Sequence, residues 1–392
     1  MSKLLFIFER DMPTVSITRD VFSHLEGHQE IKSEFSYLTD VRPSDIDSND
    51  VIILMRPNNV YAWKIAANAR KAGHVVVTFC DDDLLNLPAT NPTIPWRRKG
   101  LIKALANSDV IWSSSRHIAE KYKELTAGKR PAVMDTVVRP SELESIEAVR
   151  DHEGVRIVYA AAPSHAELFE RFVNPVIPAL VKEFGDDISF TFVSVHPQIS
   201  GVKTEYVSGM PLIEYRRFMK EGKFDVGLAP LYDDEFSKCK YFNKFIEYTT
   251  QGIVGLYSKT EPYTLVVSNE ENGFLAENNT ESWLNTLRKA ITDKKMREYC
   301  VQNAIRYLAT EHSEDACIER LRAELPEITE TLGNYQKCGG YGLNKIIYYL
   351  YRLLDSIYLV RFYIKSGGVR AVLNRVHRRF ADGKAYSRNR IK

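Results

Sequence analysis

Short apolar runs alternate with segments of helical hydrophobic periodicity along most of the chain. In the first series the runs are LLFIF at 4–8, VIILM at 51–55, HVVVTFC at 74–80, DVIWSSS at 109–115 and AVMDTVV at 132–138. A second series comprises VRIVYAAA at 155–162, ISFTFVSV at 188–195, FDVGLAPL at 224–231 and IVGLYS at 253–258. Buried strands alternating with helices predict βαβ units on parallel sheets. We therefore expect an α/β protein with two doubly wound domains.

The polar stretch SELESIEAVRDHEG at 141–154 separates the two series and predicts a domain boundary near residue 150. Further helices are expected at about 280–291, 294–309 and 314–333. The predicted domains are 1–150, 151–334 and a tail at 335–392. Because ligands of open α/β sheets bind outside the carboxyl ends of the strands, we expect the functional residues in the loops that follow strands, at a shared cleft.

Several function classes lose support from the composition. The formal net charge is only +2, and the five cysteines are scattered without a CxxC pair, which argues against a disulfide framework and a structural zinc site. Reduced thiols fit a cytoplasmic protein. No GxGxxG follows the first strand and no GxxxxGK[ST] occurs, so dinucleotide redox chemistry and P-loop chemistry lack local support. The N-terminal apolar run ends at Glu9, too short for a signal peptide or a membrane span.

The charge is concentrated in the tail. From Tyr341 onward there are twelve basic residues, against Asp355 and Asp382 as the acids. The segment 343–364 is rich in Ile, Leu, Tyr and Phe, and its charges favour a basic amphipathic helix on an anionic membrane surface over a membrane span. The alternative is a helix that packs on the protein body or on a second subunit. Nucleic-acid binding is not supported, because no recognisable module accompanies the charge.

The most informative segment is 224–274, where a predicted helix carries Lys240, Lys244 and Glu247. Spacings of four and three place these residues on one helical face. The first turn of a helix together with two lysines suits a diphosphate, and a glutamate further along can accept hydrogen bonds from ribose hydroxyls. The alternative is a solvated stripe of charges with no ligand.

With these residues the segment resembles the GT-B superfamily, specifically the retaining family 4-like glycosyltransferases of bacterial cell-surface polysaccharide synthesis. The matching pattern comprises Asp225 to Leu231, Phe236, Lys240, Lys244, Glu247 with Tyr248, Gly252, Ser258, Pro262 with Tyr263, Asn272 to Leu275, and Glu281 to Trp283. Upstream, YAAAPSH at 159–165 resembles the first strand and turn of the same domain.

The resemblance implies two Rossmann-like domains facing each other, and a donor nucleotide-sugar site in the second. Lys240 and Lys244 would contact the donor phosphates and Glu247 the ribose, with Ser164, His165, Ser258, Pro262 and Tyr263 also at the donor site. For His165, an ordinary loop histidine is an equal alternative. Two departures stand out: Cys239 occupies the position of the first acid of the family's E-x7-E pattern, and Val254 replaces the proline of G-x-P-V.

In the first half, Asp81, Asp82 and Asp83 follow a strand and precede LPATNPTIP. Adjacent carboxylates repel one another, so their placement at a strand end favours binding of an acceptor hydroxyl or acid/base assistance. The alternative is helix-capping acids in a solvated loop. Arg10 to Thr14, after the first strand, is a second candidate for contact with phosphate or acceptor, and a capped βα turn with a surface arginine is an equal alternative. No metal and no cofactor are expected, because enzymes of this superfamily stabilise the leaving diphosphate with basic side chains and the helix dipole.

The implied function is transfer of a sugar from a nucleotide-sugar donor to a glycan or lipid-linked acceptor, at the cytoplasmic face of the cell membrane. Cys239 and Val254 keep a second hypothesis open, a non-catalytic GT-B subunit that binds glycan or a partner transferase. A nucleotide-sugar epimerase of similar fold is a third.

Overall fold

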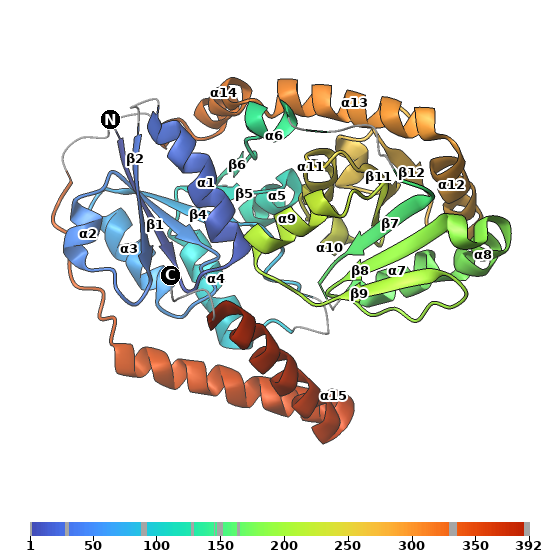
Figure 1. The fold of residues 1–392 in the computed structure, drawn as a ribbon. Coiled ribbons are helices and arrows are strands. Elements are labelled where there is room, and N and C mark those ends of the chain that lie inside the picture. Colours follow the sequence, from blue (N-terminus) through green and yellow to red (C-terminus); the bar gives the residue numbers. More distant parts are fainter. Residues whose placement is uncertain are drawn as a thin grey trace. The chain divides into compact units, whose positions relative to one another are not determined.

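The computed structural model describes residues 2–27, 31–87, 92–126, 129–144, 146, 152–162, 165–328 and 335–387, which form two compact units. Unit 1 comprises Met1–Val137 and Glu314–Lys384, and unit 2 comprises mainly Val138–Ser313. Each unit contains a parallel six-stranded sheet flanked by helices (Figure 1). This confirms the prediction of an α/β protein with two Rossmann-like domains.

The sheet of unit 1 has the strand order β2-β1-β3-β4-β5-β6. Its strands are β1 (Ser2–Phe8), β2 (Ile31–Tyr37), β3 (Val51–Met55), β4 (Val75–Cys80), β5 (Val110–Ser113) and β6 (Arg130–Val133). The helices that follow them are α1 (Pro13–Gly27), α2 (Pro43–Asp47), α3 (Ala62–Lys71), α4 (Pro95–Ala106) and α5 (Arg116–Glu124). Leu4 and Phe6 pack into one apolar cluster, and Leu5 and Ile7 into the cluster on the other face. Burial of both faces explains the continuous apolar runs of the strands.

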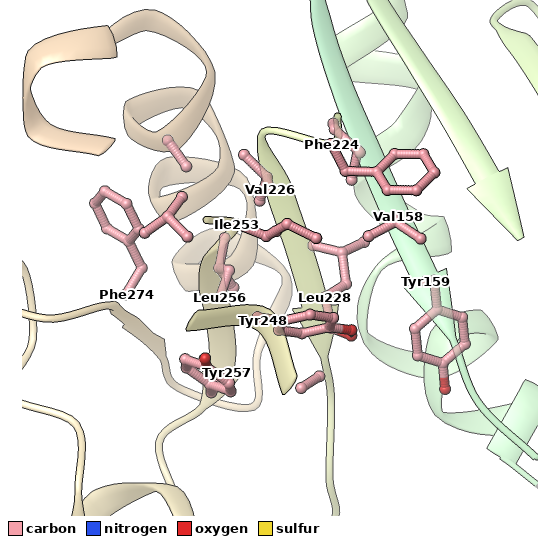
Figure 2. Packing of buried hydrophobic residues seen from close by; sticks show 14 of the residues in the cluster. Val158, Tyr159, Phe224, Val226, Leu228, Tyr248, Ile253, Leu256, Tyr257 and Phe274 are labelled. Carbon is pink, nitrogen blue, oxygen red and sulfur yellow. The ribbon is translucent and has the colours of Figure 1, made fainter. Parts of the chain in front are cut away.

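The sheet of unit 2 has the order β12-β11-β10-β7-β8-β9. Its strands are β7 (Val155–Ala160), β8 (Ile188–Val193), β9 (Lys203–Val207), β10 (Val226–Ala229), β11 (Val254–Ser258) and β12 (Phe274–Ala276). Its helices are α6 (Pro140–Glu144), α7 (Ala166–Phe172), α8 (Ile177–Phe184), α9 (Leu212–Glu221), α10 (Glu235–Lys238), α11 (Asn243–Thr249), α12 (Thr280–Thr292) and α13 (Lys294–Glu311). In the core, Val226 and Leu228 of β10 lie between Val158 of β7 and Leu256 of β11 (Figure 2).

Three strands were not recognised from the sequence. β2 and β9 are edge strands with polar, largely half-exposed or exposed residues, and β12 has only three residues. An edge strand pairs on one side only and is less fully buried, so it lacks the continuous apolar run by which the inner strands were recognised.

The division into units also differs from the predicted domain ranges. It falls at Val137 and at Ser313, rather than near residues 150 and 334. Helix α14 (Glu314–Glu324) and the turn after it return to unit 1, where Ile318, Leu325 and Ile328 join the core cluster of β1. Apolar burial against β1 and β6 therefore decides to which unit this segment belongs.

The tail forms helix α15 (Lys345–Ser387), which has two arms joined at Gly367 and Gly368 (Figure 1). Gly368 has a φ of 67°, a left-handed conformation that glycine adopts without a steric penalty. Tyr341 and Tyr348 join the second core cluster of unit 1. The start of the tail therefore packs on the protein body. Among the described residues, no helix combines the length and the apolarity needed to cross a membrane.

A buried ion network attaches the first arm of α15 to unit 1. Arg97 of α4 donates hydrogen bonds of 2.8 and 3.0 Å to Glu9 and of 2.8 and 2.5 Å to Asp355. Arg352 and Tyr348 also donate to Glu9, at 2.9 and 3.0 Å. The side chains of Arg97, Glu9 and Asp355 are only 14%, 12% and 10% exposed. Burial raises the pKa of Glu9, but hydrogen bonds and charge from Arg97 outweigh it, and the pKa falls from 4.5 to about 2.

This shift predicts a specific pH dependence. Because the pKa of Glu9 is lower in the folded state, the Glu9 carboxylate stabilises the fold above pH 4.5, and its contribution is lost as the pH falls toward 2. In Glu9→Gln no carboxylate titrates at this position. We expect the difference in unfolding free energy between wild type and Glu9→Gln to shrink by about 1.4 kcal/mol between pH 6 and pH 3.5. Urea unfolding at both pH values measures it, and a constant difference would contradict the assigned shift.

Candidate functional site

A cavity of about 390 Å³ lies at the carboxyl ends of β7, β8 and β10 in unit 2. These strand ends are where doubly wound sheets bind ligands. Its walls come from the loops after the three strands, from α9 and from the start of α11. The polar residues that line it include Tyr159, His165, Ser194, Tyr215, Lys240, Tyr241, Asn243, Lys244 and Tyr263. The cavity therefore combines several hydroxyls with two ammonium groups.

Helix α11 is held against β10 by Tyr248. Its hydroxyl donates a 2.7 Å hydrogen bond to the carbonyl of Leu228, and its ring covers Gly227. A Cβ atom at position 227 would lie 2.7 Å from that ring, so this close approach requires glycine. Figure 2 shows the ring of Tyr248 beside Leu228. This packing places the first turn of α11 at the cavity.

The sequence predicted that Lys240 and Lys244 share one helical face. In the structure they do not. The chain forms two short helices, and Lys240 lies in the break between α10 and α11. Asp234 caps α10 by accepting a 2.7 Å hydrogen bond from the amide of Ser237, and α10 ends at Lys238. Lys240 and Lys244 nevertheless both line the cavity. The lysine pair is thus brought together by tertiary structure rather than by helical phasing.

Lys244 is held by two neighbours. Its Nζ lies 2.7 and 2.9 Å from the carboxylate oxygens of Glu247 and 3.3 Å from the hydroxyl of Tyr215, which itself donates to Glu247. Burial first, and then the charge of Glu247, raise the pKa of Tyr215 well above its ordinary value, so Tyr215 remains protonated. Glu247 is not one of the described residues that line the cavity. Its present contacts orient Lys244, and its predicted contact with ribose stays a prediction.

Tyr159 holds the loop after β7. Its hydroxyl donates a 2.7 Å hydrogen bond to the carbonyl of His165, which lines the cavity. Burial raises the pKa of Tyr159 and of Tyr263, so both hydroxyls are neutral donors. Ser164, also predicted at the donor site, lies outside the described residues.

Ser258 and Pro262 support residues of the cavity wall. Ser258 is fully buried, accepts a 2.9 Å hydrogen bond from the amide of Leu231 and donates one of 2.7 Å to Asn278. It therefore positions the loop after β10, to which the cavity residue Leu231 belongs. Pro262 precedes the turn that presents Tyr263. Neither Ser258 nor Pro262 is among the described residues that line the cavity.

The two departures from the family 4 pattern also have a structural context. Cys239 is 3% exposed and is absent from the described lining of the cavity, so it offers no group to a ligand there. Val254 begins β11 and is buried in the core. Neither substitution reaches the cavity lining.

The three aspartates of unit 1 do not form one site. Asp81 accepts hydrogen bonds from Thr14 and Arg56, and Arg56 also lies 3.2 Å from Asp82. Burial lowers the pKa of Arg56, but the charges of Asp81 and Asp82 outweigh burial and raise this pKa. No helix among the described residues begins directly after them, since α4 starts at Pro95, so these acids are not helix caps.

Asp83 differs from its two neighbours. It is 1% exposed and accepts hydrogen bonds from Lys121 at 2.6 Å, Asn86 at 2.9 Å and Tyr122 at 3.1 Å. Burial raises the pKa of Asp83, but these hydrogen bonds outweigh it and the pKa is lowered. The arrangement favours a structural role for Asp83 and leaves Asp81 and Asp82 as candidates for the acceptor side.

Sequence reasoning missed Tyr215, Tyr241 and Asn243 among the cavity residues. Tyr215 lies on α9, one of the helices expected between the strands of the second series. Nothing in a helical pattern separates a tyrosine that faces a cavity from one that faces the core. Tyr241 and Asn243 lie in the segment that was read as one continuous helix.

Comparison of the sequence with protein-family models and with curated proteins found no match. Solved structures are similar over most of the chain. Anabaena HepE in complex with UDP-glucose has a TM-score of 0.53 and 13% identity, over 83% of this chain and 100% of that one. A structure of trehalose-6-phosphate synthase from work on glycosyl transfer with retention has a TM-score of 0.54 and 12% identity, over 83% and 99%. An α-glucosyltransferase in complex with UDP and DNA has a TM-score of 0.59 and 13% identity, over 84% and 99%.

At these identities the likeness concerns the fold. The two parallel six-stranded sheets, each flanked by helices, account for it. The comparisons do not separate family 4 from other families of the same architecture. The protein has the GT-B fold of nucleotide-sugar glycosyltransferases.

Proposed function

We propose that this protein is a glycosyltransferase that takes a sugar from a nucleotide-sugar donor. The observation that carries the proposal is the pair Lys240 and Lys244 on one cavity at the strand ends of unit 2. Two ammonium groups suit a diphosphate, and the surrounding hydroxyls suit sugar and ribose. The neighbours bound to UDP-glucose or UDP support a nucleotide sugar as the donor.

The proposed reaction breaks the bond between the anomeric carbon and the diphosphate oxygen while an acceptor hydroxyl attacks that carbon and passes its proton to the departing diphosphate. Lys240 and Lys244 offset the negative charge that grows on the departing diphosphate. Their contribution is largest in the transition state, where this charge develops. Glu247 and Tyr215 keep the Nζ of Lys244 in place, so little reorganisation is needed. We expect no metal requirement, and therefore unchanged activity in excess chelator.

Retention of configuration is part of the proposal. It is supported by the family 4 resemblance and by the similarity to a trehalose-6-phosphate synthase studied for transfer with retention. The acceptor is proposed to be a glycan or lipid-linked intermediate of cell-surface polysaccharide synthesis. Asp81 and Asp82 are the proposed hydrogen-bonding partners of its hydroxyl, because their carboxylates are only partly buried, at 20% and 33% exposure.

Release of free nucleoside diphosphate from a panel of nucleotide sugars, with and without membrane extract, tests the proposal. A thermal-shift screen of UDP, GDP, ADP and CMP identifies the base beforehand. We expect one nucleotide to stabilise the protein and its sugar conjugate to be consumed faster with extract. Nucleotide binding without turnover under any condition would favour the hypothesis of a non-catalytic subunit. That hypothesis rests on Cys239 and Val254, which replace the acid and the proline of the family pattern.

We further propose that α15 binds the cytoplasmic face of an anionic membrane. Exposed apolar side chains run along it, among them Ile346, Tyr349, Leu350, Leu353, Leu354, Ile357 and Ile364. Arg361, Lys365 and Arg370 are exposed on the same helix. An amphipathic helix with both features inserts its apolar side chains between headgroups while its cations attract anionic lipid.

Replacing Arg361, Lys365 and Arg370 together by glutamine is expected to weaken binding to phosphatidylglycerol vesicles about 100-fold, at about 1 kcal/mol for each cation. Vesicle co-sedimentation at low salt measures this. The matched control replaces two arginines and one lysine that are exposed on α9, Arg216, Arg217 and Lys220, and should bind as wild type. Wild-type protein that ignores the anionic vesicles would contradict the membrane assignment.

A further inference from the structure

A second cavity, of about 550 Å³, lies within unit 1 at the carboxyl ends of β1 and β3. Helix α15 forms one of its walls. Its volume is within the range of about 300–1,000 Å³ that is typical of ligand pockets. Every described residue that lines it belongs to unit 1, so it is a different cavity from the one in unit 2.

One part of the cavity is strongly charged. Four arginines and two carboxylates line it: Arg10, Arg56, Arg97, Arg352, Glu9 and Asp355. Arg97 and Arg352 are paired with the two acids, and Arg56 is paired with Asp81 and Asp82. Arg10 forms no hydrogen bond or ion pair with the part of the chain that the structure describes. Partial burial lowers the pKa of Arg10, and the charge of Glu9 opposes this effect. The charges of Arg352, Arg97 and Arg56 lower the pKa further. Among these four arginines, Arg10 is therefore the one whose N–H groups are not taken up by a described carboxylate, and they can donate to an anion.

The other part of the cavity is apolar. Its walls include Leu84, Leu87, Leu359, Val360, Val372 and Val376. The last four come from both arms of α15, on the two sides of the bend at Gly367 and Gly368. Val360 and Val376 are 40% and 43% exposed, so this part opens to the surface. The opening therefore lies on the helix that carries the exposed apolar side chains and cations.

We propose that this cavity binds the acceptor as an anionic amphiphile. A phosphate or diphosphate lies at Arg10, and a hydrocarbon chain runs between Leu359 and Val372 toward the membrane side of α15. The inference rests on the proposed glycosyltransferase function and narrows its acceptor to the lipid-linked class. A free glycan fits less well, because the aliphatic walls offer no hydrogen bonds to its hydroxyls.

Binding of octyl phosphate and decyl phosphate below their micellar concentrations tests the proposal on the full-length protein. Calorimetry with inorganic phosphate and with decyl maltoside supplies the ligand controls. Each buried methylene should raise the affinity about fourfold, so decyl phosphate should bind more than tenfold tighter than octyl phosphate. Arg10→Gln should weaken decyl phosphate about tenfold, and Leu359→Asn should reduce the gain from the longer chain. Arg42→Gln, which removes a 76% exposed arginine in unit 1, is the matched control and should bind as wild type.

The outcomes separate the parts of the idea. Equal affinity for inorganic and decyl phosphate would overturn the apolar part, and equal affinity for decyl maltoside and decyl phosphate would overturn the anionic part. Decyl phosphate binding that neither Arg10→Gln nor Leu359→Asn alters, in variants that melt as wild type, would place the amphiphile elsewhere and overturn the site. Nucleotide binding is measured on the same samples. Intact nucleotide binding and turnover without amphiphile binding would refute this inference and leave the glycosyltransferase proposal standing.

Discussion

Replacing Lys244 by alanine is expected to lower the rate of sugar transfer about 100- to 1,000-fold, and Lys240→Ala to have an effect of similar size. Both ammonium groups line the cavity of unit 2, where the leaving diphosphate is proposed to lie. A preorganised donor aimed at developing charge contributes about 2.7 to 4 kcal/mol to the barrier reduction. The loss should appear mainly in kcat, because the charge on the diphosphate grows during bond breaking.

Lys238→Ala is the matched control. Lys238 is only two positions from Lys240, but it ends α10, pairs with Glu235 at 3.3 Å and is absent from the described lining of the cavity. Its rate should stay within about twofold of wild type, as for other exposed ion pairs. Steady-state release of nucleoside diphosphate and the thermal midpoint are measured for all three variants. Near-normal turnover in both Lys240→Ala and Lys244→Ala would contradict the proposal that the donor diphosphate binds in this cavity.

Arg97→Met should have the largest effect on stability. It leaves the buried carboxylates of Glu9 and Asp355 without their main cation, a change that costs about 3 to 5 kcal/mol in comparable buried pairs. Asp355 belongs to α15, so we expect this helix to detach from unit 1 before the sheet unfolds. Hydrogen exchange of 345–366 measures the detachment, and urea unfolding measures the global loss.

Two further variants identify the cause. Adding Glu9→Gln and Asp355→Asn to Arg97→Met removes the uncompensated charges and should recover much of the stability. Lys345→Met breaks an exposed pair with Asp40, whose side chains are 63% and 55% exposed, and should cost at most about 1 kcal/mol. Equal effects of Arg97→Met and Lys345→Met would show that the buried network does not attach the tail.

The doubly wound fold was predictable because inner parallel strands are buried on both faces. LLFIF, VIILM and HVVVTFC therefore read as strands without any knowledge of their partners. The edge strands β2 and β9 were not predictable in this way, since their polar residues resemble loop sequence. The lysine pair could be singled out from its spacing and its family resemblance. The two short helices α10 and α11 could not be predicted in place of one, because neither their ends nor the packing of Tyr248 on Leu228 is expressed in residue spacing.

The sequence therefore established the order of the inner strands, the GT-B-like pattern around Lys240 and Lys244, and the basic, apolar-rich composition of the tail. These are local properties, expressed in residue spacing and composition. Contacts between distant segments came from the folded chain alone. Tyr215 and Glu247 meet across 32 positions, and Trp96 donates to Asp355 across 259. Such partners carry no periodic signal. Burial makes an unpaired charge or donor costly, so the pairing depends on which groups the fold brings close together.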